Sequence, residues 1–212
     1  MNLLFLHGLG QGPDSWNKVV DALGPDANTA CPDLFGLCKG GLDYPNLYAA
    51  LEGWMEPLPE PAVLCGLSLG AVLALDYAIR RPEKIAGLVL IAPQYKMPRT
   101  LLRLQNFLFR LMPEGAFAGA GMGKGDTIRL TTSMMELDFR RELGQVVCPV
   151  LVLTGEKDAA NRKAARELAG LLPDAKVREI PGAGHEVNRD APGELAAAIC
   201  GFAESISTSM NE

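Results

Sequence analysis

Six short apolar segments alternate with stretches of helical periodicity along this chain of 212 residues. Strands that alternate with helices are joined by crossover connections, and this favours a parallel sheet. Runs that are apolar throughout also indicate burial on both faces of that sheet. The sequence therefore predicts an α/β fold, with a mostly parallel sheet of about six strands flanked by helices on both faces. The expected strands are Leu3–Leu6, Asn28–Cys31, Ala62–Cys65, Gly87–Ile91, Val150–Thr154 and Lys176–Ile180.

Amphipathic helices are expected between these strands. Apolar residues recur every three or four positions over 47–55 and again over 195–206, so each set shares one helical face. A length of 212 residues suits one domain spanning 1–212, which is long enough to bury a substantial core.

The alternation breaks at about 94–145, where a helical insertion is expected. A helix over Arg99–Met112 is apolar around much of its circumference, with a polar stripe of Arg99, Arg103, Asn106 and Arg110. The following segment, Gly115–Gly125, is rich in Gly and Ala and has little to pack, which indicates a flexible loop. An insertion of this size between strands is typical of a lid over a binding site, although a helix simply packed on the body would give the same pattern.

Composition narrows the class of protein. The net charge of −5 gives neither a basic patch for nucleic acid nor a polybasic segment for an anionic membrane. No apolar run approaches the roughly 18 residues of a membrane span, and the first residues leave no room for a signal peptide. The five cysteines lack the spacing of a disulfide framework or a metal site, so we expect reduced thiols and no metal. Reduced thiols and the first residues together favour a cytoplasmic location. No cofactor is expected. The expected partner is a small-molecule substrate, with the protein a monomer or a homodimer.

A Gly-x-Ser-x-Gly segment lies where the third strand meets a helix of small residues. This arrangement, Gly66 to Gly70, lifts the hydroxyl of Ser68 onto a sharp, exposed corner. Glycine suits both flanking positions because the backbone there is strained and closely packed. The pattern alone is weak evidence, since a serine can also stand there merely to cap the helix.

An acid and a histidine follow Ser68 in the chain, each just after a strand. Asp158 comes after Val150–Thr154, and His185 comes after Lys176–Ile180. In open α/β sheets, catalytic groups gather at this edge, and the order Ser, Asp, His is that of one hydrolase class. With two histidines in the chain, His185 has little competition as the base. Asp158 could instead cap the helix Ala160–Leu171, and Glu156 is the alternative acid.

The other histidine, His7, begins a glycine-rich loop after the first strand. Such a loop lets backbone N–H groups face a reacting centre. We expect the N–H groups of Leu9 and Leu69 to form the oxyanion hole. His7 itself is interpreted as a structural residue that holds the loop by hydrogen bonds.

Together these segments resemble the α/β-hydrolase superfamily. The resemblance rests on His7-Gly8, Pro32–Gly36, the serine turn, Thr154–Asp158 and Gly182–His185, and spans nearly the whole chain except about 94–145. It implies a Ser68–Asp158–His185 catalytic triad, and for Asp33 the role of a structural anchor. Larger members carry an extra N-terminal hairpin that this sequence lacks, which implies a sheet trimmed to about six strands.

The expected activity is that of a serine hydrolase, carboxylesterase-like, that cleaves a small-to-medium, largely apolar ester, lactone or thioester through an acyl-enzyme. The acyl pocket is expected between the serine turn and the insertion. Two alternatives stay open: a C–C lyase or eliminase using the same triad, and a ligand-sensing receptor on a hydrolase fold. The residues expected to line the pocket are Leu101, Leu104, Phe107, Leu108 and Met112.

Overall fold

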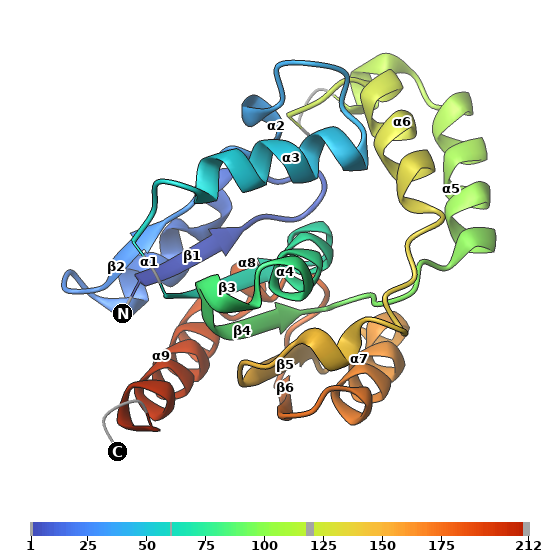
Figure 1. The fold of residues 1–212 in the computed structure, drawn as a ribbon. Coiled ribbons are helices and arrows are strands. Elements are labelled where there is room, and N and C mark those ends of the chain that lie inside the picture. The colour runs from blue at the N-terminus through green and yellow to red at the C-terminus, as the bar shows by residue number, and fades with distance from the viewer. Residues whose placement is uncertain (1, 60, 118–120, 210–212) are drawn as a thin grey trace.

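The core of the protein is a six-stranded parallel sheet (Figure 1). The computed structural model describes residues 2–59, 61–117 and 121–209. The sheet has the order β2-β1-β3-β4-β5-β6. All six expected strands are therefore confirmed, with ends that differ by a few residues. Their bounds are β1 Asn2–Leu6, β2 Asn28–Ala30, β3 Ala62–Leu67, β4 Ile85–Ile91, β5 Val150–Gly155 and β6 Ala175–Ile180.

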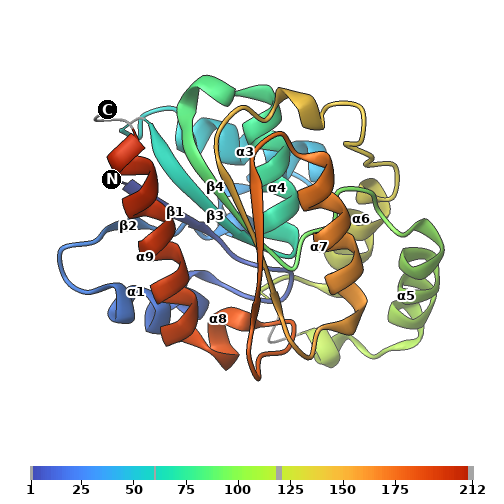
Figure 2. The ribbon, with the colours of Figure 1, turned by 90° about the horizontal axis from the view of Figure 1, so that it is seen from below.

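Helices cover both faces of the sheet, as the sequence predicts (Figures 1 and 2). Successive side chains of a strand point to opposite faces. In β1, Leu4 faces the layer formed by α3, α4 and α7, whereas Phe5 faces the layer formed by α1, α8 and α9. The helices of these two layers are α3 Tyr44–Met55, α4 Leu69–Arg80 and α7 Ala159–Leu171 on one side, and α1 Asn17–Leu23, α8 Val187–Asp190 and α9 Pro192–Ser209 on the other.

Short helices join these elements. A single turn, α2 (Leu34–Leu37), follows β2. Asp33 caps its N-terminus, because the carboxylate accepts a hydrogen bond from Gly36 N at 3.1 Å. Asp33 is thus placed as a helix cap that anchors the loop after β2. The 3₁₀ helices outside the insertion are η1 Pro13–Trp16 and η2 Pro82–Lys84.

Between β4 and β5 the chain leaves the sheet and forms the helical insertion, residues 94–145. Its segments are α5 Arg99–Leu111, η3 Glu114–Phe117, α6 Lys124–Met134 and η4 Leu143–Gln145. In Figures 1 and 2, α5 is the outermost helix at this end of the molecule, and α6 packs against α3 and α5. The sequence expectation of a flexible loop over Gly115–Gly125 is wrong at both ends, because 115–117 belong to η3 and Lys124 and Gly125 belong to α6. Residues 118–120 lie outside the described residues.

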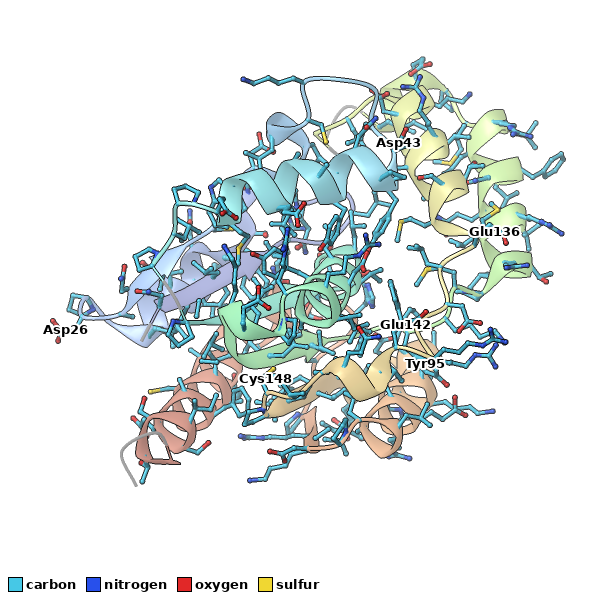
Figure 3. All side chains as sticks on the ribbon, in the orientation of Figure 1. Asp26, Asp43, Tyr95, Glu136, Glu142 and Cys148 are labelled. Carbon is cyan, nitrogen blue, oxygen red and sulfur yellow. The ribbon has the colours of Figure 1, made fainter. Side chains whose placement is uncertain are left out.

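The insertion is joined to the sheet by two chain segments that pair with each other. Lys96 and Asp138 form an antiparallel bridge, and Met97 N donates to Leu137 O at 3.1 Å. Tyr95, labelled in Figure 3, donates its hydroxyl to Glu167 of α7 at 3.1 Å. The insertion therefore begins and ends at one narrow neck beside α7.

Candidate active site

Ser68 stands at a strained turn between β3 and α4. Its backbone has φ 53° and ψ −110°, a conformation that is rare for a residue with a side chain. The two glycines that flank it are required by close packing. A Cβ at Gly66 would lie 2.2 Å from Gly70 O, and a Cβ at Gly70 would lie 2.1 Å from Leu6 O. The turn is thus fixed by contacts with β1 and with its own helix.

The loops after β5 and β6 are joined by backbone contacts. Glu156 N donates to Ile180 O at 3.0 Å, and Lys157 N donates to Ala183 O at 2.8 Å. At Gly155 the chains approach so closely that a Cβ would lie 2.1 Å from Gly184 O. These contacts bring Asp158 and His185 together at the carboxyl edge of the sheet, the edge at which Ser68 follows β3.

Asp158 and His185 form a direct pair. His185 Nδ1 lies 2.8 Å from Asp158 Oδ2, and the carboxylate is buried while the imidazole remains partly exposed. Asp158 also caps α7 by accepting from Asn161 N at 3.3 Å, so the capping role and the contact with histidine coexist. Glu156, the alternative acid, instead accepts from Gly182 N at 2.8 Å and so braces the histidine loop.

The side-chain amide of Asn161, which the sequence does not identify as a site residue, supports this pair. Asn161 Nδ2 donates to both carboxylate oxygens of Asp158 at 2.9 Å and lies 3.1 Å from His185 Nδ1. Its own Oδ1 accepts from Gln94 Nε2 at 2.7 Å. The Asp-x-x-Asn spacing at the start of a helix could have pointed to Asn161, but no sequence signal indicates Gln94, which is 67 residues away.

His7 holds the loop after β1, as the sequence predicts. Its Nδ1 donates to Gly8 O at 3.1 Å and its Nε2 accepts from Leu34 N at 3.1 Å, so the imidazole is neutral. Burial lowers its pKa from the ordinary value, because it penalises the charged form. A Cβ on Gly8 would lie 3.7 Å from Ser68 Cβ, which shows how close this loop runs to the serine turn.

Cys65, which lies near the turn, is fully buried in β3. Burial raises the pKa of its thiol far above the usual range, so it stays a thiol and not a thiolate. In the described part of the chain, no cluster of three or more His, Cys, Asp or Glu side chains is arranged to hold a metal ion. No helix in the same residues is both long enough and apolar enough to cross a bilayer.

A cavity of about 510 Å³ opens beside Ser68. Ser68, Leu9 and Leu69 share its wall, and the first turn of α4 leaves N–H groups without a partner inside the helix. Asn161 also lines it and contacts the Asp158–His185 pair. His185 itself is not part of the wall. Among the described residues, Ser68 Oγ and His185 form no hydrogen bond, although such contacts often close only when substrate is bound.

The wall of this cavity corrects the expected acyl pocket. Of the five side chains assigned to it, Leu101 lines the cavity. The other four, Leu104, Phe107, Leu108 and Met112, lie outside the wall and are exposed to solvent. The sequence shows that α5 is apolar around much of its circumference, but these four side chains lie on the part that points outward. The cavity is lined instead by Val72, Ala92, Gln94, Met97, Pro98, Leu102, Gln105, Thr131, Met134, Ala160, Lys163, Ala164 and Glu167, besides the residues named above.

Comparisons with known proteins show which family the sequence resembles. A family model described as "Alpha/beta hydrolase family" matches residues 3–198. A pimeloyl-[acyl-carrier protein] methyl ester esterase of Aromatoleum aromaticum is 29% identical over 244 residues, which cover 93% of this chain and 96% of that protein. The biotin biosynthesis bifunctional protein BioHC of Cellvibrio japonicus is also 29% identical, over 99% of this chain, but this chain spans about half of that protein's length (49%).

Solved structures share the fold at lower identity. The enol-lactonase from Burkholderia xenovorans has a TM-score of 0.84 at 20% identity, covering 96% of this chain and 91% of that one. A thermophilic esterase from Thermogutta terrifontis has a TM-score of 0.79 at 21% identity, covering 97% and 90%. At these identities the likeness establishes the fold alone.

Proposed function

Because the chain belongs to the alpha/beta hydrolase family, we propose that it is a serine esterase with Ser68 as the nucleophile. The observation that carries the proposal is the 2.8 Å contact between His185 Nδ1 and Asp158, at the sheet edge where Ser68 stands. A serine hydroxyl is a weak nucleophile and needs a positioned base. His185 Nε2 takes the Ser68 proton during attack on the ester carbonyl, and Asp158 holds the imidazole in the required tautomer.

The tetrahedral intermediate carries a negative charge that needs hydrogen-bond donors. We assign this role to the backbone N–H groups of Leu9 and Leu69, two residues that line the cavity together with Ser68. Each such donor typically contributes about 3 kcal/mol to the transition state. The alcohol then leaves with a proton from His185, and water attacks the acyl-enzyme with His185 again as base.

The cavity favours an ester with an apolar acyl part of small to medium length. Its wall includes the apolar side chains of Val72, Met97 and Met134, and methionine adapts to varied acyl shapes. The named activity of the relatives, hydrolysis of the methyl ester of a pimeloyl group, supports a medium-length acyl chain. We therefore propose a methyl or other small alkyl ester as the substrate class. The lyase and receptor alternatives are not favoured by these relatives, which are named as esterases.

A series of methyl esters tests this substrate class. We expect kcat/KM to rise from acetate to a medium-length acyl chain, because each buried methylene contributes about 0.8 kcal/mol, and to fall once the cavity is filled. Monomethyl pimelate is included to measure the effect of a distal carboxylate. A rate independent of chain length would contradict an acyl pocket of this size, and a strong preference for charged acyl groups would contradict its apolar character.

We propose that Asn161 positions the acid of the triad. Asn161→Ala is expected to lower kcat about tenfold, because the Asp158 carboxylate loses two charge-assisted hydrogen bonds in a buried position. Asn161→Asp, which places a second carboxylate against Asp158, is expected to lower kcat further. Asn28→Ala, at an exposed site on β2, is the control. Steady-state kinetics of the three variants decide the matter, and full activity of Asn161→Ala would remove this residue from the site.

A further inference from the structure

The outward face of α5 is apolar although solvent surrounds it. Nine large apolar side chains are exposed among the described residues, and six of them lie on α5 or at its C-terminal cap. A concentration of this kind on one helix marks an interaction surface more often than chance exposure. We call these six residues the apolar ridge: Leu101, Leu104, Phe107, Leu108, Leu111 and Met112, which are 38–70% exposed.

The inner face of α5 carries Leu102, which packs against the core, Phe109, whose ring contacts that of Phe117, and one buried polar residue. Asn106 is buried, donates to Thr132 Oγ1 at 2.9 Å and accepts from Thr131 Oγ1 at 2.6 Å. Asn106, which the sequence groups with three arginines in a polar stripe, thus faces α6 and is buried. An ordinary surface helix turns its apolar face inward. The packing of α5 on α6 does not use the apolar ridge, which stays exposed among the described residues.

A row of cations borders the ridge. Arg99, Arg103 and Arg110 are spaced by four and seven residues and therefore share one side of α5, next to Phe107. The helix contains no Asp or Glu. Arg99 pairs with Glu136, which is labelled in Figure 3, whereas Arg103 and Arg110 form no ion pair within the described residues. The positive edge is thus local to α5 in a chain whose net charge is −5.

We propose that this face of α5 binds the surface of an anionic lipid bilayer. A helix with an apolar face beside a basic one lies in the plane of the interface, with its apolar side chains below the headgroups and its guanidinium groups among them. A second copy of the chain fits less well, because a two-fold contact would bring two arginine rows together with no acid on α5 to pair with them. As the outermost helix, α5 is free to approach a flat surface (Figures 1 and 2).

The position of α5 relative to the cavity suggests that membrane binding would bring substrate close to Ser68. Leu101 belongs to the apolar ridge and also lines the cavity beside Ser68. A bound surface therefore lies next to the cavity, where an ester that partitions into lipid can pass from one to the other. Binding itself requires no turnover, so it is tested separately from the esterase proposal.

Flotation with lipid vesicles tests the proposal on the full chain. We expect the protein to float with vesicles of equal parts phosphatidylcholine and phosphatidylglycerol, and to stay in solution with phosphatidylcholine alone. Arg103→Gln and Arg110→Gln should each weaken partitioning about fivefold, since an arginine near an anionic surface contributes about that factor. The double variant Leu104→Glu/Leu108→Glu should lose binding altogether, because it places carboxylates in the ridge.

Val147→Glu is the control, since Val147 is 72% exposed and does not belong to α5. It should bind vesicles like the wild type, and thermal unfolding of every variant checks that the fold is retained. The proposal is overturned if the wild type does not float with anionic vesicles, or if the folded double variant floats as well as the wild type. It is also overturned if light scattering shows a dimer that the double variant dissociates, because the ridge would then be a contact between copies.

Discussion

Ester turnover is expected to fall by about three to six orders of magnitude when Ser68 is replaced by alanine. The hydroxyl forms and breaks the covalent bond to the acyl group, and without it only the oxyanion donors and the binding of substrate still accelerate the reaction. Steady-state kinetics with the best ester of the methyl series measure the loss. A fluorophosphonate probe, which reacts with activated serines, should label the wild type at Ser68 and leave the variant unlabelled.

The matched control is Ser205→Ala, an exposed position on α9 that should keep full activity and full labelling. Equal thermal unfolding of both variants and the wild type would exclude a folding defect. If Ser68→Ala retains esterase activity above a trace, Ser68 is not the nucleophile. If the folded wild type neither labels nor turns over any ester in the series, the receptor alternative gains support.

Replacing Gly70 with alanine is expected to lower the free energy of unfolding by about 3 kcal/mol or to prevent soluble expression. A Cβ at this position would lie 2.1 Å from Leu6 O and 2.9 Å from His7 O, both backbone atoms that cannot rotate away. To relieve the overlap, α4 must move off β1, yet α4 is buried along almost its whole length. Overpacking of a closely packed core typically costs 1–3 kcal/mol, and more when backbone must shift.

Gly53→Ala isolates this effect from the general consequence of replacing a glycine in a helix. Gly53 lies in α3, and nothing lies within 4 Å of the Cβ that alanine would add. Alanine favours the helix there, so the variant should be more stable by about 0.5–1 kcal/mol. Urea denaturation of both variants gives the comparison. Changes of the same size and sign would show that the contact with Leu6 O does not govern the fold of the turn.

The sequence predicted the six strands well because each carries a strong local signal. The runs of β1, β3, β4 and β5 are apolar and buried on both faces, whereas the edge strands β2 and β6 are partly exposed. Glycine, proline or acidic residues follow several of the strands and mark where they end. The contact between Asp158 and His185 was also predictable, since the ends of parallel strands meet at one edge. The order Ser68, Asp158, His185 along the chain then identifies these three residues as the candidate site.

The surroundings of the site were less predictable because they depend on contacts between distant segments. The hydrogen bond from Gln94 to Asn161 joins residues 67 positions apart, and no local sequence pattern predicts it. Four of the five apolar residues of α5 and its C-terminal cap that the sequence assigns to the pocket lie outside the cavity wall for a related reason. Periodicity shows which residues share a face of a helix, but the direction of that face is set by what the helix packs against. Here the inward side of α5 carries Asn106, bonded to Thr131 and Thr132, together with Leu102 and Phe109.

The neck at Lys96 and Asp138 has a consequence for how proteins of this kind diversify. Because the two segments pair there, the sheet meets the insertion at two adjacent points, whatever lies between them. Changes in the length or number of helices beyond the neck leave the distance between β4 and β5 untouched, and longer loops cost little extra closure entropy. The segment between Lys96 and Asp138 can thus be replaced, in evolution or by design, to change the substrate specificity. The strand ends that hold Ser68, Asp158 and His185 stay the same.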